Sequence, residues 1–135
     1  MAVRSINFSQ KRRLIIAGLE VPLELHVQRP FAALLPAYDT VEARQAEDAA
    51  ERLIELGCVE FCLVGPQAEL VHDALDEIIE ARGALDVVTT GHCDALEGCE
   101  YFLFAAGGRT AGLLAVTSPH AELESMLEKV AREGE

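Results

Sequence analysis

The segment from Val59 to Arg82 constrains the fold more than any other part of this sequence. It opens with an apolar run, Val59–Val64, which is typical of a strand covered on both faces. A Gly-Pro turn at residues 65–66 follows, and the next apolar residues recur at helical spacing. These residues are Leu70, Val71, Ala74, Leu75, Ile78 and Ile79. A buried strand, a turn and an amphipathic helix make half of a βαβ unit, so we expect neighbouring segments to repeat it.

Four such strand and helix pairs are expected, beginning at Phe31 and ending near the C-terminus. The expected strands are Phe31–Leu35, Val59–Val64, Leu85–Thr90 and Ala111–Thr117. Short connections between such units force parallel strands with right-handed crossovers, and helices then cover both faces of the sheet. The sequence therefore predicts an α/β fold of Rossmann-like or flavodoxin-like type. We expect a three-layer sandwich with a mainly parallel, four-stranded sheet.

Local capping signals place the helix ends. Asp39 and Asp94 each have a glutamate three residues later, which is the pattern of a capping box. Gly57 and Gly83 fit the left-handed position just past a helix. Residues 94–106 could contain a strand, but helical spacing of the apolar positions favours a helix. Leu96, Cys99, Leu103 and Ala106 carry that spacing. Ser118 and Pro119 read as the cap and first residue of the last helix.

The first 30 residues differ from the rest in charge. They carry five basic and two acidic residues, a net of +3, which leaves −15 for the remainder of a chain whose total is −12. Leu14–Ile16 and Leu23–Val27 read as weak strands, and prolines flanking the second suggest an edge position. We therefore expect residues 1–30 to form a basic arm with one or two antiparallel edge strands, and residues 31–135 to form the α/β domain.

The acidic body restricts the classes of partner. It repels a phosphate backbone, so nucleic-acid binding is not expected, whereas a basic protein partner is electrostatically easier. Solubility alone is the simpler interpretation of the charge, and a homodimer stays open. The apolar stretch after Lys11–Arg13 is too short for a signal peptide or a membrane span. The four cysteines have spacings unlike those of zinc sites, so we expect reduced thiols in a cytoplasmic protein.

The carboxyl ends of the expected strands are where an open parallel sheet binds ligands. The residues there with side chains suited to binding are Tyr38, Asp39, Thr90, His92, Ser118 and His120. The candidates for catalysis are His92, Cys93, His120 and Asp39. In the functional interpretation His92 is a general base and Cys93 a nucleophile beside a helix N-terminus. In the alternative, this segment is a simple strand-to-helix turn capped by Asp94.

His92 and His120 could approach each other if the third and fourth strands are neighbours. With Asp39 they would then make a set that suits zinc or iron. No motif fixes such ligand geometry, so we expect no metal and no cofactor. Loops of the dinucleotide-binding and P-loop types are absent from the sequence. The expected strand ends carry no lysine or arginine, which disfavours phosphate binding.

The helix after residue 67 carries an acidic face opposite its apolar one. Its carboxylates are Asp73, Asp76, Glu77 and Glu80, with His72 four residues before Asp76. A solvated helix face is the simpler interpretation. The alternative is a contact surface for a basic partner.

Several of these features together resemble a small uncharacterised bacterial α/β domain family. They are Pro30-Phe31, Gly57-Cys58, Gly65-Pro66, the acidic segment His72–Asp76, and Thr89-Thr90-Gly91-His92 with Asp94. The resemblance runs from about Pro30 to the C-terminus. It supports the α/β domain and implies no activity.

Two functions compete at this point. The first is a non-catalytic acidic module that binds a protein partner, as an immunity protein or a regulatory subunit does. The second is a small-ligand-binding or hydrolase-like domain that uses the strand ends around His92 and His120. The first is preferred because of the acidic body, and whether catalysis occurs is left open.

Overall fold

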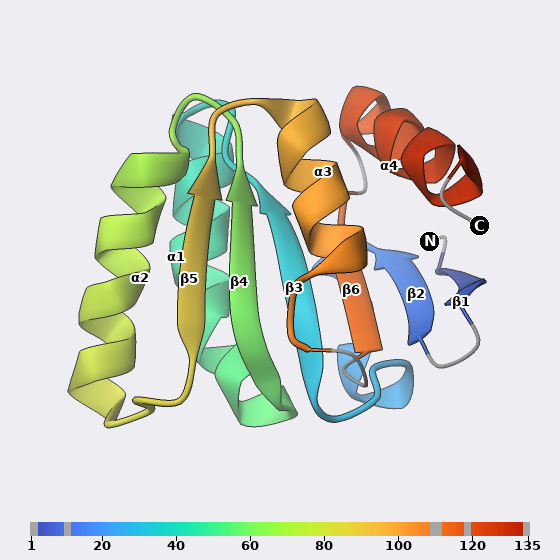
Figure 1. Cartoon of the computed structure of the whole chain (residues 1–135). Coiled ribbons are helices and arrows are strands. Elements are labelled where there is room, and N and C mark those ends of the chain that lie inside the picture. Colours follow the sequence, from blue (N-terminus) through green and yellow to red (C-terminus); the bar gives the residue numbers. More distant parts are fainter. Residues whose placement is uncertain (1–2, 10–11, 109–111, 118–119, 134–135) are drawn as a thin grey trace.

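The computed structural model describes residues 3–9, 12–108, 112–117 and 120–133. Within these residues it contains six strands, one 3-10 helix and four α-helices (Figure 1). The strands are β1 (Arg4–Ser9), β2 (Arg12–Ala17), β3 (Phe31–Pro36), β4 (Cys58–Val64), β5 (Val88–His92) and β6 (Gly112–Val116). The helices are η1 (Leu23–Leu25), α1 (Thr40–Leu56), α2 (Ala68–Arg82), α3 (Ala95–Phe104) and α4 (Ala121–Glu133).

The strands form one sheet in the order β1-β2-β6-β3-β4-β5. All neighbours pair in parallel except β1, which runs antiparallel to β2 at one edge. The mainly parallel sheet and the antiparallel N-terminal edge are thus confirmed. The predicted count of four strands is wrong for the part of the chain described, because β1 and β2 extend the sheet beside β6. Leu14–Ile16, predicted as an antiparallel edge strand, lies within β2 but pairs in parallel with β6, and the antiparallel edge strand is β1.

Apolar side chains on both faces of the central strands build two cores. In β3, Ala33 and Leu35 pack with α1 and α2, whereas Ala32 and Leu34 pack with α3 and α4. All four side chains are at most 1% exposed. Figure 1 shows the two helix pairs on opposite sides of the sheet. A strand covered on both faces needs apolar residues at every position, which explains the continuous run in this segment.

The capping signals are confirmed by the helix ends. The Asp39 carboxylate accepts a hydrogen bond from the backbone N–H of Glu42 at 2.9 Å, and α1 follows. Asp94 accepts from the N–H of Glu97 at 3.0 Å, so the segment with two interpretations is the helix α3. Gly57 and Gly83, with φ of 109° and 70°, lie in the left-handed region past α1 and α2. Ser118 and Pro119, predicted to begin the last helix, lie outside the described residues.

The prediction of a second N-terminal strand at Leu23–Val27 is wrong. Leu23–Leu25 is the 3-10 helix η1, in which the N–H of His26 donates to the carbonyl of Leu23 at 2.9 Å. Leu23 is buried, but Leu25 is 74% exposed, so the apolar alternation does not mark one buried face. The guanidinium of Arg52 on α1 donates to two carbonyls just before η1, at 2.9 and 3.0 Å. These bonds hold the segment across α1 instead of along the sheet.

Smaller corrections concern the ends of elements. The strand predicted at residues 85–90 is β5 at residues 88–92, and Leu85 is 78% exposed outside it. Leu70 and Leu96, which carry the predicted apolar helical spacing, are 61% and 49% exposed, and Val41 on α1 is 63% exposed. Each lies in the first turn of its helix, which begins beyond a strand end where no sheet surface covers it. None of the described helices combines the length and apolarity needed to cross a membrane.

Candidate functional site

The site begins at the point where the order of strands reverses. The chain moves from β3 to β4 to β5 in one direction and then returns to place β6 on the other side of β3. The helix after β3, α1, covers one face of the sheet, and the helix after β6, α4, covers the other. The two connections therefore diverge above neighbouring strands. In open α/β sheets ligands bind in the crevice that such a divergence leaves.

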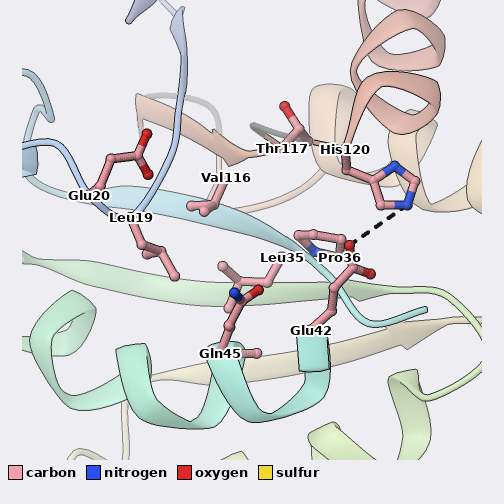
Figure 2. A pocket seen from close by; sticks show the side chains of 10 residues that line it. Leu19, Glu20, Leu35, Pro36, Glu42, Gln45, Val116, Thr117 and His120 are labelled. Carbon is pink, nitrogen blue, oxygen red and sulfur yellow. Dashed lines mark ion pairs between the residues drawn. The ribbon is translucent and has the colours of Figure 1, made fainter. Parts of the chain in front are cut away.

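A pocket of about 110 Å³ occupies this crevice (Figure 2). The ends of β3 and β6, the first turns of α1, the residue before α4 and the segment after β2 all contribute to it. The lining residues are Leu19, Glu20, Leu35, Pro36, Glu42, Gln45, Ala46, Val116, Thr117 and His120. The volume is about that of four water molecules in the liquid. The pocket therefore suits a small molecule or one end of a larger one.

Glu42 and His120 meet at the rim of the pocket. The Nε2 atom of His120 lies 3.8 Å from Oε2 of Glu42, an ion pair when the imidazole is protonated. The other carboxylate oxygen of Glu42, Oε1, accepts a hydrogen bond from the backbone N–H of Tyr38 at 2.9 Å. The Tyr38 ring packs on the imidazole with 4.4 Å between ring centroids. Both side chains at the rim are less than one-fifth exposed, so their positions are well defined by packing.

The tautomer of the neutral His120 ring follows from a hydrogen bond at its other nitrogen. The backbone N–H of Leu123, in the first turn of α4, donates to Nδ1 of His120 at 3.2 Å. A nitrogen that accepts this bond carries no proton, so the neutral ring carries its proton on Nε2. Figure 2 shows the Nε2 side of the ring directed toward the Glu42 carboxylate. The ring therefore presents a hydrogen-bond donor to the rim and lacks the lone pair that a general base would need there.

The pocket has an apolar floor and acidic walls. Leu35 and Val116 come from the two strands, and Ala46 comes from α1. Glu20 and Glu42 place carboxylates on two sides of it (Figure 2). Among the described residues that line it none is lysine or arginine. The charged side chains that line the pocket are therefore acidic, which favours a ligand with a positive charge.

The remaining polar groups near the pocket are less available. Thr117 is fully buried, and its hydroxyl donates to Oε1 of Glu124 at 3.4 Å. Burial, followed by the nearby Cys99 and Glu42, raises the pKa of the Tyr38 hydroxyl above its ordinary value. That phenol therefore stays neutral at physiological pH.

The predicted binding residues divide into two groups. Tyr38, Asp39 and His120 lie together at the switch point between β3 and β6, although the Asp39 carboxylate is used in capping α1. Ser118 falls outside the described residues. Thr90 and His92 lie on β5, and the hydroxyl of Thr90 donates to a backbone carbonyl of β4 at 3.5 Å. The two groups do not form one site.

His92 and His120 are kept apart by the strand order. β3 and β4 lie between β5 and β6, so the two strand ends are three spacings apart. At about 4.8 Å per spacing this is about 14 Å, too far for one metal ion or one reacting atom. The condition for the predicted metal set is therefore not met. Of the described residues, no group of three or more histidine, cysteine or carboxylate side chains could hold a metal ion.

His92 is enclosed by α3. Its side chain is 11% exposed, its ring centroid lies 5.0 Å from that of Tyr101, and its Nδ1 lies 4.0 Å from Oε1 of Glu97. The Nε2 atom is buried, with no hydrogen-bond partner among the described residues. Gly98 packs so closely that an added Cβ would lie 2.8 Å from a methyl group of Val64. These contacts leave no room for a substrate beside the imidazole.

The cysteines differ in exposure. Cys58, Cys62 and Cys99 are buried, and Cys93 is exposed; none is in a disulfide. Burial raises the pKa of Cys62 and Cys99 to about 12 and raises that of Cys58 further. Those three thiols stay protonated and behave as small apolar side chains. Cys93, one of the predicted catalytic candidates, lies just beyond β5 and therefore about three strand spacings from the switch point.

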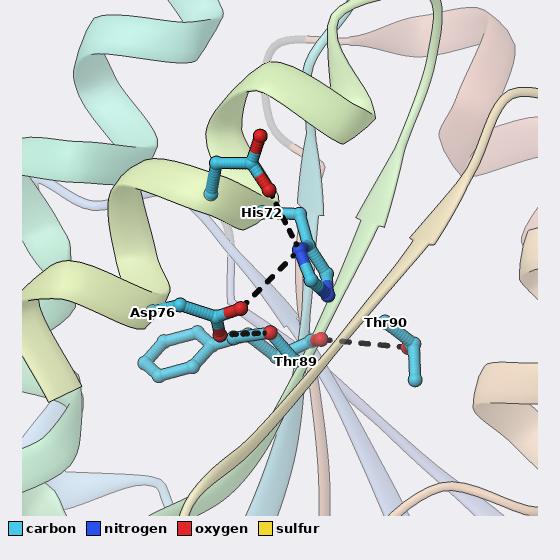
Figure 3. Close-up of polar contacts among 6 residues, drawn as sticks. His72, Asp76, Thr89 and Thr90 are labelled. Carbon is cyan, nitrogen blue, oxygen red and sulfur yellow. Dashed lines mark hydrogen bonds and ion pairs between the residues drawn. The ribbon is translucent and has the colours of Figure 1, made fainter. Parts of the chain in front are cut away.

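The acidic face of α2 is solvent-exposed. Asp73, Asp76, Glu77 and Glu80 are all exposed. Asp76 accepts a hydrogen bond from the hydroxyl of Thr89 on β5 at 2.5 Å, and Nδ1 of His72 lies 3.4 Å from the carboxylates of Asp73 and Asp76 (Figure 3). These contacts tie the acidic face of α2 to the edge of the sheet.

Sequence reasoning missed most of the pocket. Glu20, Gln45 and Thr117 were not predicted, and Glu42 was interpreted only as part of a capping box. The strand order unites these residues, and it cannot be read from spacing along the chain. One signal in the sequence was available, the capping glutamate Glu42. Its side chain accepts a hydrogen bond from the N–H of Tyr38, the residue before the cap, and this places its carboxylate above the end of β3.

Fold and site together define an open, mostly parallel α/β domain with an acidic pocket at its topological switch point. The chain belongs to the family described as "Domain of unknown function (DUF7684)", whose model matches residues 15–133. The match begins inside β2 and runs to the end of α4. Searches of curated proteins and of solved structures give no match to this chain.

Proposed function

We propose that this chain is a binding domain that holds a small organic cation in the pocket at its switch point. The proposal rests on one observation: the pocket combines two carboxylates, on Glu20 and Glu42, with an apolar floor. A primary ammonium group on a short apolar chain matches both features. The charge would meet the carboxylates, and the carbon chain would pack on Leu35 and Val116.

The polar groups at the rim support binding more than catalysis. The Nε2–H of His120 is a donor and Oε2 of Glu42 an acceptor, so the pair can orient a ligand by hydrogen bonds. A hydrolase that forms a covalent intermediate would need a nucleophile with a base in contact. Thr117 carries the hydroxyl closest to this role among the lining residues, and it is fully buried.

The test is a calorimetric titration with three compounds of one length: n-butylammonium, 1-butanol and butyrate. We expect n-butylammonium to bind with a Kd of about 0.1–1 mM, which is about 1 kcal/mol per non-hydrogen atom and below the ceiling for very small ligands. Binding of 1-butanol should be at least tenfold weaker, and butyrate should give no heat. Equal binding of the three compounds would remove the proposal.

A matched pair of variants locates the binding. Glu42→Gln keeps an acceptor for the Tyr38 N–H but loses the charge, so it should weaken n-butylammonium at least tenfold. Glu97→Gln makes the same change in the same position of α3, beside His92, and should leave binding within twofold. If the second variant lost as much affinity as the first, a general effect of net charge would explain the binding.

A second candidate function rests on a separate observation. The acidic face of α2 is exposed next to an edge strand, and the whole chain carries a net charge of −12. These features favour docking of a basic protein partner, without catalysis. A docking role predicts association that weakens steeply as salt rises from about 0.05 to 0.5 M, because exposed charges are screened over that range.

A further inference from the structure

The two edges of the sheet differ in how they are protected. At the β1 edge the pairing with β2 shifts register between Asn7 and Ser9, and Arg4 forms ion pairs with Glu124 and Glu128. Bulges and charged residues are the usual means by which proteins prevent another strand from adding to an edge. This edge is therefore guarded.

The β5 edge carries none of these protections within Val88–His92. Its pairing with β4 is regular over all five residues, and the strand contains no proline, lysine or carboxylate. No described strand pairs with its outer side. All five residues are partly or fully exposed, although the strand belongs to a sheet whose other parallel strands are almost entirely buried.

The direction of the backbone groups on β5 can be assigned. The carbonyl of His92 accepts from the N–H of Gly65 at 2.9 Å and thus points toward the β4 side. Backbone groups of alternate residues in a strand point to opposite sides. The N–H and C=O groups of Thr89 and Gly91 therefore point outward, where a further strand could pair with them.

The side chains beside this edge define what could pair there. Thr89 faces α2 through its bond with Asp76, and Nδ1 of His72 lies 3.4 Å from the carboxylates of Asp76 and Asp73. Asp73, Asp76 and Glu77 are exposed on this helix. Val88 faces the opposite side of the sheet and is 51% exposed. An added strand would thus meet the carboxylates of α2 on one face and the exposed Val88 side chain on the other.

A second copy of this chain does not fit this edge. Two β5 strands paired antiparallel about a two-fold axis would bring two α2 helices together on the same face. Their acidic faces would then oppose each other, and like charges in that arrangement repel. The occupant must carry the opposite charge.

We infer that the outer edge of β5 binds an extended segment of a partner protein, about five residues long, in which basic and apolar residues alternate. The basic side chains lie toward α2 and the apolar ones toward Val88. This inference names the surface for the docking function above and rests on it. It is independent of the cation pocket.

The experiment uses a capped five-residue peptide that alternates lysine and valine, and a control peptide with glutamate in place of lysine. Amide exchange is measured on the full chain by NMR. The lysine peptide should slow exchange of the Thr89 and Gly91 amides at least tenfold, and the glutamate peptide should not. Equal protection by both peptides, or protection elsewhere alone, would overturn the inference.

Variants of one residue separate backbone pairing from charge. Thr89→Pro removes an outward N–H that β4 does not use, and proline is tolerated at such edge positions. It should weaken the lysine peptide at least tenfold, whereas Thr89→Val, which keeps the N–H, should stay within twofold. Undiminished binding to the proline variant contradicts edge pairing. Loss in Glu42→Gln with retention in Thr89→Pro would place the peptide's lysine in the switch-point pocket and also refute the inference.

Discussion

Two strand ends of this protein carry a histidine, and they behave differently. At the end of β6, His120 lines an open pocket between diverging connections, with one ring nitrogen bonded to α4 and the other facing Glu42. At the end of β5, His92 is enclosed by α3, and its Nε2 atom is buried with no partner among the described residues. A histidine at this edge of the sheet therefore lines a pocket at the end of β6, whereas at the end of β5 it is packed against α3.

The two ends differ because the connections that leave the two strands run differently. After β5 only Cys93 and Asp94 precede α3, and Gly98 brings that helix into direct contact with Val64 and His92. After β6 the chain leads to α4 on one face, while α1 leaves β3 on the other. The comparison teaches that a histidine at a strand end indicates a binding site only where neighbouring connections diverge.

The largest expected effect concerns Tyr101, which packs on His92. We call the end of β5 the closed end and the end of β6, with its pocket, the open end. The Tyr101 hydroxyl donates to Oε2 of Glu60 at 2.5 Å, and Glu60 is only 8% exposed. Tyr101→Phe leaves that buried carboxylate without one of its donors and should cost about 2–3 kcal/mol at pH 7 by urea denaturation. Tyr38→Phe, the same change at the open end, should cost less than about 1 kcal/mol, because among the described residues no buried carboxylate depends on the Tyr38 hydroxyl.

The same residue gives a pH dependence with a definite sign. Burial, and then the bond to Glu60, raises the pKa of Tyr101 above its ordinary value of 10. The folded state therefore keeps a proton that the unfolded state loses, and stability should fall as pH rises above about 10. Absorbance at 295 nm should show little tyrosinate in the native protein at pH 10. Half-ionisation of both tyrosines at that pH would contradict the burial of the Tyr101 hydroxyl.

The next effect compares added volume at the two ends. Gly98→Ala places a Cβ 2.8 Å from Val64 and 3.1 Å from the Cβ of His92. It should destabilise the fold by about 1–2 kcal/mol, because overpacking outweighs the gain in helix propensity. Ala46→Leu adds more atoms but points them into the pocket. It should change stability by less than about 1 kcal/mol and abolish binding of n-butylammonium. If thermal denaturation showed that Gly98→Ala and Ala46→Leu destabilise the protein equally, the proposed difference between the two ends would be contradicted.

Replacing each histidine by phenylalanine should give opposite signs. His92→Phe removes a buried nitrogen without a partner and keeps the ring volume, so it should stabilise by about 1 kcal/mol. His120→Phe removes the acceptor of the Leu123 N–H at the start of α4 and should destabilise by about 1 kcal/mol. The check is the free energy of unfolding of the two variants under one condition. Changes of the same sign would show that the two environments are alike.

The smallest effect is expected at Cys93, the exposed thiol beyond β5. An aromatic disulfide reagent should label one thiol in the native protein and four after denaturation, because the other three are buried. A methylthio group on Cys93 should change stability by less than about 0.5 kcal/mol. It should also leave n-butylammonium binding unchanged, since this thiol lies at the closed end. If labelling of Cys93 abolished n-butylammonium binding, the end of β5 would contribute to the binding site, which contradicts the account.

The sequence was most informative where the cause is local. Asp39, Asp94, Gly57 and Gly83 mark helix ends because capping depends on residues close in the chain. The alternation at Leu23–Val27 was misleading, since the side chain of Arg52, far along the chain, binds the backbone just before it. The pattern of residues 23–27 cannot indicate a contact made by a residue so far along the chain.

The site depends on strand order, and for this reason it was only partly predictable. His120 and Tyr38 follow strands whose ends could be recognised, so they were found. Glu20 and Thr117 become neighbours only after β6 inserts between β2 and β3. His92 had the same local signal as His120, and nothing in its immediate sequence indicates that α3 encloses it.

The central claim is that the small organic cation binds at the switch point and not beside His92 at the end of β5. Titration of the isotopically labelled chain with n-butylammonium, followed by backbone amide shifts, tests it most directly. The account predicts shifts that saturate at Glu20, Glu42, Gln45 and His120, with residues 90–95 unchanged. Saturating shifts at residues 90–95, with Glu42 and His120 unaffected, would contradict it.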